Sequence, residues 1–311
     1  MRIAFSLTSP GITSWKSGGA AGKSFSGYSD ENNLVQHIPI DYSSPAFVRT
    51  SIKENWKNYH YCLGRAPSVE LSIGKYLTWL ITNMPDHFMN LVVCTDVPGE
   101  GIDDLVRDAL DHFRSLNIRK LSWLADEGVP ATELRKSLLD QGLSFAESFA
   151  TEMAIDVNEL RDAPEAAGLE IGLVDDEDSL RKWIHVASVG FGVPAEAEEI
   201  WFEFYNYAAC DSPFHTYLAL LNGRPVATSQ LFTSAGVAGI YSVSCLPDAR
   251  GQGIGAAITH RALLDARRME YRVGILQASL IGYNVYRRLG FEDHGSLSVY
   301  TWTNTDGTTG N

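Results

Sequence analysis

The sequence predicts a mixed α/β fold, of the α+β type, built as two domains of similar size. The chain has 311 residues, and a globular domain commonly takes about 150. Strand-like and helix-like segments alternate through most of the chain, which is typical of sheets flanked by helices. The same order of segments occurs in both halves. We therefore expect domains at residues 1–163 and 164–303, followed by a disordered tail at 304–311.

The composition is that of an acidic globular protein. Lys and Arg total 25 and Asp and Glu total 38, which gives a formal net charge of −13. This balance argues against nucleic-acid binding and against a polybasic membrane anchor, since both need clustered basic residues. No apolar run is long enough to span a bilayer, and Met1–Leu7 turns polar too soon for a signal peptide. We expect a cytoplasmic protein with no nucleic-acid partner and no membrane contact.

The four cysteines have neither zinc-ligand spacing nor the density of a disulfide framework. We expect reduced, mostly buried thiols and no metal site. His60 and His87 stand alone among aromatic residues, which favours structural roles. Residues 17–24 nearly spell a phosphate-binding loop, but Ser17 replaces its first glycine and no apolar helix follows. We interpret that segment as a loop.

The first half carries the weaker pattern. Residues 9–33 are rich in Ser and Gly, which indicates a loop, and residues 56–93 are compact and aromatic. Residues 158–168 predict a connector to the second half. Between these segments, strands and helices are expected in alternation, beginning with a strand, at 88–95, 102–116, 120–125, 131–141 and 151–157.

The second half repeats the pattern more sharply. Asn222-Gly223 between two apolar runs predicts a hairpin. Helices are expected at 179–189, 196–209, 254–269 and 283–289. Strands are expected at 169–174, 216–221, 225–233, 237–246, 273–278 and 296–302.

A glycine-rich loop lies between the predicted strand 237–246 and the helix that follows it. It contains Gly251, Gly253 and Gly255, and no acidic residue stands in the first turn of the helix. Such a loop lets backbone N–H groups approach an anion at the positive end of the helix. No Lys-Ser or Lys-Thr follows the last glycine, and no acidic strand end follows at dinucleotide spacing. The pattern indicates pyrophosphate binding of another kind.

Two motifs in this half resemble those of the GCN5-related N-acetyltransferases (GNATs). Arg250, Gly253 and Gly255, behind Leu246-Pro247, match that family's acyl-CoA loop. The aromatic segment Val285–Phe291, which ends in Leu-Gly-Phe, matches its second signature. The two motifs stand in the family's order with one helix and one strand between them. The resemblance covers residues 169–303.

The resemblance implies a splayed mixed sheet in which strand 237–246 carries a bulge and parts from strand 273–278. A backbone N–H near Cys245 or Leu246 would polarise the thioester carbonyl, and Tyr286 would protonate the departing thiolate. Ser279 stands where the family often has an Asn that reaches the cofactor. The implied cofactor-binding residues are Cys245, Leu246, Arg250, Gly251, Gln252, Gly253, Ile254, Gly255, Ala256, Ser279 and Tyr286.

The general base departs from the family pattern. Many relatives carry a Glu on the strand that corresponds to residues 238–242, and this chain has no carboxylate there. Glu203, Asp211 and His215 border the expected acceptor entrance, although each residue type is more typical of a surface or capping position. Cys245 raises the alternative of an acyl-cysteine route, but its place in a strand favours a buried structural thiol.

The first half resembles a degenerate copy of the second. Residues 119–125 echo 272–278, and residues 138–143 echo 286–291. The loop at 97–104 is shorter than its counterpart and places Asp103 and Asp104 where a pyrophosphate would bind. Leu138 stands at the tyrosine position. We expect a scaffold that retains the fold without the cofactor site.

These observations together predict an enzyme that transfers an acyl group, most simply acetyl from acetyl-CoA, to the amine of a small molecule. The amine would attack directly in a ternary complex. Two alternatives remain: a non-catalytic acyl-CoA-binding module, and a transferase that acts on a hydroxyl or a thiol-containing amine. The tandem arrangement is compatible with a monomer or a homodimer.

Overall fold

The computed structural model describes residues 44–82, 89–94, 100–126, 131–146, 150–209 and 213–304. Four predictions lie outside these ranges: the loop at 9–33, the Ser17–Ser24 segment, His87 and Asp211. The tail prediction is only partly covered. Asn304 is described and donates its N–H to Arg119 O at 2.8 Å, so it is held at the end of the last strand; residues 305–311 lie outside the described ranges.

The first half contains more regular structure than its sequence pattern predicts. One helix and three strands were not predicted: α1, β1, β2 and the two-residue β5. Helix α1 buries polar Ser51, Asn55 and His60 beside its apolar residues, which hides the apolar periodicity. The elements are α1 (Pro45–Leu63), β1 (Glu70–Ile73), β2 (Leu77–Ile81), β3 (Leu91–Cys94), α2 (Ile102–Ser115), β4 (Lys120–Asp126), α3 (Ala131–Asp140), β5 (Ser144–Phe145) and β6 (Ala150–Asp156).

The second half follows its predicted order closely. The hairpin across Asn222-Gly223 is confirmed, and both residues have the positive φ angles that such a turn needs. The elements are β7 (Leu169–Leu173), α4 (Glu177–Phe191), α5 (Glu198–Ala209), β8 (Phe214–Leu221), β9 (Arg224–Ser234), β10 (Val237–Cys245), α6 (Ile254–Arg268), β11 (Val273–Ala278), α7 (Leu280–Leu289) and β12 (Glu292–Thr303).

The strands of both halves form one continuous mixed sheet. Within the described residues it has twelve strands, eleven of them in the order β1-β2-β3-β4-β12-β6-β11-β10-β9-β8-β7, with β5 paired to β12. Strand β6 comes from the first half but pairs with β11 of the second. Strand β12 comes from the second half but pairs with β4 of the first. The halves are therefore interlocked at the centre of the sheet, where β6 and β12 pair with each other.

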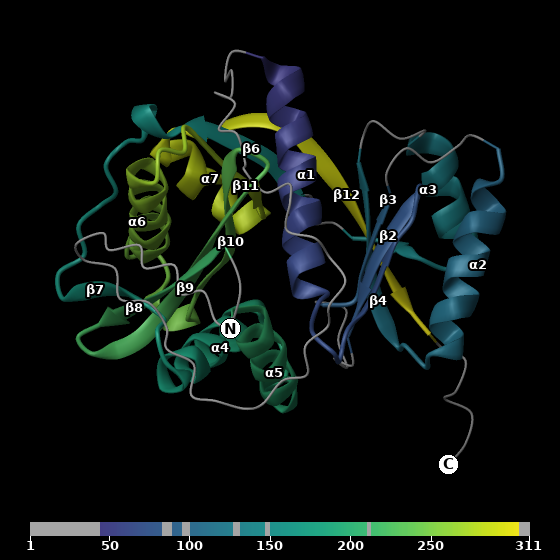
Figure 1. Ribbon diagram of the computed structural model, residues 1–311, viewed down its shortest axis with the longest axis horizontal. Helices are drawn as coiled ribbons and strands as arrows, with labels where there is room; N and C mark the ends of the chain where they lie inside the picture. Colours follow the sequence, from purple (N-terminus) through teal and green to yellow (C-terminus); the bar gives the residue numbers. More distant parts are fainter. Residues whose placement is uncertain are drawn as a thin grey trace, which may run out of the picture.

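Helices cover both faces of the sheet in the second half (Figure 1). On one face, α6 packs on a core that includes Ile258, Ala262 and Leu276. On the other face, α4 and α5 form a second core, to which they contribute Trp183 and Trp201. Helix α1 lies between the two halves (Figure 1). It extends the second face, where its Val48 and Ile52 contact β6, β10 and β11. We call the first the α6 face and the second the α1 face.

The two halves share a four-element unit, as the internal repeat predicts. In the first half, β3 and β4 are parallel neighbours joined through α2, and α3 follows. In the second half, β10 and β11 are parallel neighbours joined through α6, and α7 follows. Both connecting helices begin after a glycine with left-handed φ, 83° at Gly101 and 80° at Gly253. The likeness therefore extends to the helix cap.

Among the described residues, no helix has both the length and the apolar character needed to cross a membrane.

Candidate active site

The site begins where β10 leaves β11. These strands pair only at Ala238–Gly274 and Gly239–Ile275. On its other side, β10 shifts register against β9 between Tyr241 and Ser244, and Ser242 has a positive φ of 51°. A bulge of this kind bends a strand away from its neighbour. The predicted bulge and the predicted parting of the strands are both confirmed.

The glycine-rich loop leads from the end of β10 into α6. A short 3-10 turn at Pro247–Ala249 is followed by Gly251 and Gly253, with φ of 76° and 80°. Gly253 caps α6, no side chain bonds to the cap, and the first turn carries no acid. The N–H groups of the first helical residues have no acceptor within a helix. This helix end therefore offers backbone donors and a positive dipole end to an anion.

Arg250 and Gln252 hold this loop in shape. Arg250 Nε donates to Cys245 O at 3.1 Å, and its guanidinium also donates to Gly190 O at 3.0 Å. The arginine thus ties the loop to the end of α4. Gln252 Nε2 donates to Asp248 O at 3.2 Å. Both residues lie at the loop as predicted, and in this structure their polar atoms bond to the protein's own backbone.

The backbone of β10 aims one N–H group into the gap between the strands. Leu246 N donates to Val226 O of β9 at 2.9 Å, so this N–H is already engaged. Successive N–H groups of an extended strand point to opposite sides. The N–H of Cys245 is therefore directed away from β9, toward the side on which β11 has separated. Of the two predicted carbonyl-polarising positions, Cys245 has the better orientation.

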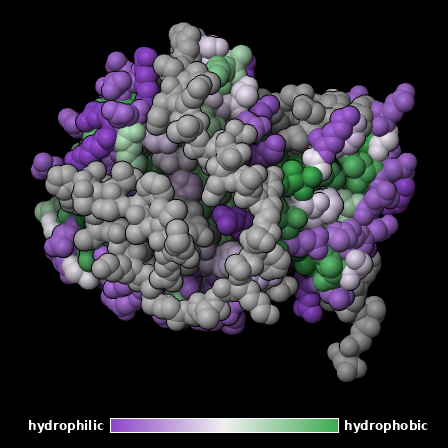
Figure 2. Space-filling model, viewed as in Figure 1, coloured by the Kyte–Doolittle hydropathy of each residue, from purple (hydrophilic) through white to green (hydrophobic). Residues whose placement is uncertain are grey.

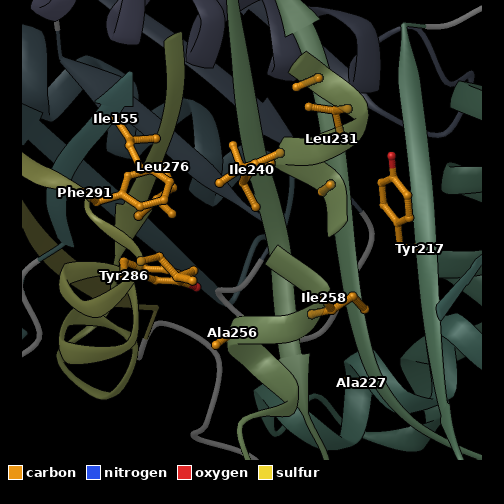
Figure 3. Close-up of a cluster of buried hydrophobic side chains, with 14 of the residues drawn as sticks. Ile155, Tyr217, Ala227, Leu231, Ile240, Ala256, Ile258, Leu276, Tyr286 and Phe291 are labelled. Carbon is orange, nitrogen blue, oxygen red and sulfur yellow. The ribbon is translucent and has the colours of Figure 1, made fainter. Parts of the chain in front are cut away.

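Tyr286 lies on α7 with its ring packed edge-on against Phe291, at 5.9 Å between ring centroids. Tyr286 is buried, with 8% of its surface exposed. In Figure 3 its hydroxyl oxygen points away from α7 and toward the α6 side of the cluster. Burial, with a smaller contribution from Cys245, raises the pKa of Tyr286 well above its ordinary value. The phenol therefore stays protonated at neutral pH and can donate a proton.

Cys245 is a free, partly buried thiol on the same side of the sheet. Burial raises its pKa to about 11, and the positive charge of nearby Arg250 offsets only part of the rise. A thiol with such a pKa is almost fully protonated at pH 7 and is a poor nucleophile. This favours the predicted structural role over an acyl-cysteine route.

Ser279 caps α7, which begins three residues earlier than the sequence pattern indicates. Its Oγ accepts a bond from Gly282 N at 3.3 Å. The next two residues, Leu280 and Ile281, are 65% and 80% exposed. The first turn of α7 therefore presents apolar side chains to the outside, next to the position that the resemblance assigns to a cofactor contact.

Two of the base candidates chosen from the sequence, Glu203 and His215, are described by the structure, and Asp211 lies outside the described residues. Glu203 is exposed on α5. His215 lies on β8 two residues before Tyr217, which packs in the core under α6. Burial lowers the pKa of His215, and the charge of Asp265 on α6 partly offsets this. His215 therefore belongs to the α6 face, on a strand that is separated from β11 by β10 and β9.

The sequence pattern missed a buried polar cluster on the α1 face. Tyr59 of α1 stacks on Tyr241 of β10 with 4.0 Å between ring centroids. The hydroxyls of Tyr59 and Tyr205 lie 3.3 Å apart, and Tyr205 OH lies 3.4 Å from Ser242 Oγ at the bulge. Asn55 of α1 accepts from Tyr241 OH at 2.7 Å. No sequence motif marks this cluster, because its members meet only when α1 and α5 pack beside β10.

The corresponding place in the first half is acidic. Gly101 caps α2, but Asp103 and Asp104 occupy the first turn, and Asp104 pairs with Arg107. A hollow of about 380 Å³ lies here, lined also by Glu133 and Lys136. Hydrophilic side chains gather over α2 at the right edge of the molecule (Figure 2). The described part of β3 stays paired with β4 over all four residues, so these strands do not separate there.

Comparison with known proteins connects these features to a family. Residues 212–293 match the model of the acetyltransferase (GNAT) domain. A GCN5-related N-acetyltransferase from Kribbella flavida is 18% identical, with a TM-score of 0.61 over 81% of this chain and 95% of its own. One from Sphaerobacter thermophilus is 16% identical, with a TM-score of 0.56 over 84% and 93%.

A tandem GNAT protein from the clavulanic acid biosynthesis pathway is also similar. It is 15% identical, with a TM-score of 0.53 over 81% of this chain and 95% of its own. At these identities, the solved structures show a shared fold. No curated protein matches the sequence.

The matched segment contains the bulged strand, the glycine-rich loop and the two strands that separate beside it. Residues 212–293 match the GNAT domain, and the fold of the chain resembles that of a tandem GNAT protein over most of its length. GNAT domains in general carry out acetyl transfer from acetyl-CoA.

Proposed function

We propose that this protein transfers an acetyl group from acetyl-CoA to the amine of a small molecule, by direct attack of the amine in a ternary complex. The observation that carries the proposal is the glycine-capped, acid-free start of α6 beside the gap between β10 and β11. A pyrophosphate on that helix end would leave the pantetheine arm free to enter the gap. The acceptor would then approach from the opposite face.

The residues present suit acetyl-CoA. The backbone N–H groups of Gln252–Ala256 would hold the pyrophosphate, with Arg250 keeping the loop in place. A Cβ added at Gly255 would lie 3.6 Å from Cys245 Sγ, so the first turn of α6 packs closely on the end of β10. Acetyl-CoA would supply the activated acyl group; the protein's own groups would orient it and move protons.

Two groups of this chain would act on the thioester. The Cys245 N–H would donate to its carbonyl oxygen and stabilise the negative charge that develops there. The Tyr286 hydroxyl would give its proton to the departing sulfur. The high pKa of Tyr286 keeps that proton available at neutral pH. The acidity of the chain mildly favours a cationic acceptor through electrostatic steering.

A second candidate function follows from one observation: β10 carries no carboxylate at residues 238–242. A chain without a base would bind acyl-CoA without turning it over. The first half would serve as scaffold in either case, since its α2 terminus is acidic.

A panel of small amines, amino sugars and peptide amines incubated with acetyl-CoA tests the proposal. Free thiol release and product mass are measured together. We expect an N-acetyl product in step with thiol release. Tight acetyl-CoA binding without any product would contradict it and favour the binding module, and an O-acetyl or S-acetyl product would favour a different acceptor.

A further inference from the structure

The side chain at position 277 lies on the α1 face of β11, opposite the loop that would hold the cofactor. Val273 and Ile275 of this strand pack with Val48 and Ile52 of α1, whereas Leu276 and Ala278 pack in the core under α6. Side chains alternate along a strand, so Gln277 faces the α1 side. It stands two residues beyond Ile275, the last residue of β11 that pairs with β10. Gln277 therefore lies at the open part of the gap.

A carboxylate from the first half stands beside Gln277. In β6, Ala154 packs on the α1 face, and Met153 and Ile155 pack on the α6 face. Glu152 therefore points to the α1 face. It is directly opposite Gln277 in the antiparallel pair of β6 and β11, and opposite side chains of such a pair lie about 5 Å apart at Cβ. Glu152 is 4% exposed.

The Glu152 carboxylate has neighbours on the bulged strand β10 and on β12. Its charge contributes to raising the pKa of Tyr241, after burial, so it lies within electrostatic range of the bulged strand. Gly295 of β12 is its partner on the other side. A Cβ at Gly295 would lie 2.6 Å from Glu152 Oε2, so a glycine leaves the room that the carboxylate occupies.

Gln277 adds a donor that the fold does not use. Among the described residues, its Nε2 atom is buried and has no hydrogen-bond partner. Buried donors are normally satisfied by protein or by bound water or ligand. A donor of this kind next to a buried carboxylate fits a polar group of a bound acceptor.

We infer that Glu152, supplied by the first half on the exchanged strand β6, is the general base that deprotonates the amine acceptor. The inference rests on the proposed function and gives the first half a chemical part beyond that of a scaffold. It also accounts for the absence of a carboxylate on β10, since the base enters from two strands away, across β11. Because Glu152 lies on the face opposite the cofactor loop, it meets an acceptor that enters from the α1 side.

The protons balance as follows. The ammonium of the acceptor gives one proton to the Glu152 carboxylate, directly or through one water, and becomes a neutral amine. Its lone pair forms the C–N bond to the carbonyl carbon as the C–S bond breaks. The sulfur takes a proton from Tyr286, which recovers one through solvent from the new amide nitrogen. Glu152 returns its proton to water, so that the products are amide, CoA thiol and one H⁺.

The test compares Glu152→Gln with the wild-type chain and with Asp156→Asn. Asp156 is a buried carboxylate on the same strand and face, but it pairs with Arg272 at 2.8 Å. It lies opposite Val273, at the end of β11 away from the gap. We expect Glu152→Gln to lower kcat about 100-fold, in the range of lost general-base catalysis, with unchanged acetyl-CoA affinity by calorimetry. Asp156→Asn should lower stability and leave kcat near the wild-type value.

A second variant moves the carboxylate without removing it. In Gly295→Ala the new methyl group would displace Glu152 Oε2, so kcat should fall while the protein stays folded. The acceptor supplies a further readout. A hydrazide that is already neutral at pH 7.5 needs no base before attack, so Glu152→Gln should slow it far less than a cationic amine of the same skeleton.

Three results separate the possible failures. A wild-type chain that gives no N-acyl product overturns the proposed function and this inference with it. An active wild type with an equally active Glu152→Gln variant overturns the inference alone. Equal losses for the hydrazide and the cationic amine would also overturn it, because they would indicate a structural role for Glu152.

Discussion

The starts of α2 and α6 are built alike and differ in charge. Each follows a strand with a parallel neighbour, and each is capped by a glycine in the same left-handed conformation. The sequences then diverge, from Gly101-Ile102-Asp103-Asp104 to Gly253-Ile254-Gly255-Ala256. Acids at a helix start stabilise the helix and repel an anion. The start of α2 is thus stabilised by acids, whereas the start of α6 keeps its positive dipole end uncompensated, as the proposed pyrophosphate site requires.

The strands beside these helices differ in the same sense. The described part of β3 stays paired with β4, whereas β10 leaves β11 after two residue pairs. An intact ladder satisfies backbone groups and stabilises the sheet. Where the ladder is split, the backbone N–H and C=O groups of the two strands are left for a bound ligand or for water. The two halves therefore share the fold of the unit and differ at the end where the proposed site lies, through a few residues.

The largest expected effect comes from making α6 resemble α2. Gly255→Asp places a carboxylate where Asp103 stands in the first half and should weaken acetyl-CoA binding at least about 100-fold by charge repulsion. The control is Gly255→Ala, whose new Cβ would lie at an ordinary 3.6 Å from Cys245 Sγ. Calorimetric titration of both variants measures the effect. Equal affinities would show that this helix end does not hold the pyrophosphate.

The next effect concerns Tyr286, whose counterpart in the first half is Leu138. Tyr286→Phe should lower kcat about 100-fold through loss of the proton donor, and acetyl-CoA affinity should stay nearly the same. Tyr283→Phe on the same helix is the control, because the exposed Tyr283 hydroxyl bonds only Asp293 among the described contacts. Steady-state rates of the two variants decide the role. A Tyr286→Phe chain as fast as the wild type would remove Tyr286 as the acid.

His60 tests whether the two halves pack as one body. It is buried on α1, between the halves, and burial lowers its pKa from 6.5 to about 4. Between pH 6.5 and pH 4, His60 is protonated in the unfolded chain but neutral in the folded one. Its contribution to the free energy of unfolding is therefore fully present above pH 6.5 and is lost as the pH falls toward 4. We expect a loss of about 2 kcal/mol from pH 7.5 to pH 5 from this group.

Urea unfolding at the two pH values measures that loss, and His60→Gln should make the pH dependence shallower. A wild-type profile that matches the variant's would mean that His60 is solvated, and hence that α1 is not packed between the halves.

The smallest effect is expected in the first half. Asp103→Asn with Asp104→Asn should cost about 1 kcal/mol of stability or less, since it removes favourable charges from the start of α2. No acetyl-CoA site should appear, because β3 and β4 remain paired. Urea unfolding and a cofactor titration report the two results. A second site in this variant would show that charge alone silenced the first half.

The sequence predicted the glycine-rich loop before α6 and the elements of the second half well, because glycine spacing, the Asn-Gly turn and apolar periodicity are local signals. It did not predict α1, whose buried Ser51, Asn55 and His60 break the apolar stripe. It also missed the exchange of β6 and β12, since strand pairing across the halves leaves no local pattern. Glu152 went unnoticed for that reason: its neighbours Gln277 and Gly295 are remote in sequence.

The chain holds two copies of the same unit, and only the second is proposed to bind acyl-CoA. Calorimetric titration of the wild-type chain with acetyl-CoA measures the number of binding sites per chain. We predict one site per chain, lost in Gly255→Asp and retained in Asp103→Asn with Asp104→Asn. Two sites per chain, or none, would contradict the claim.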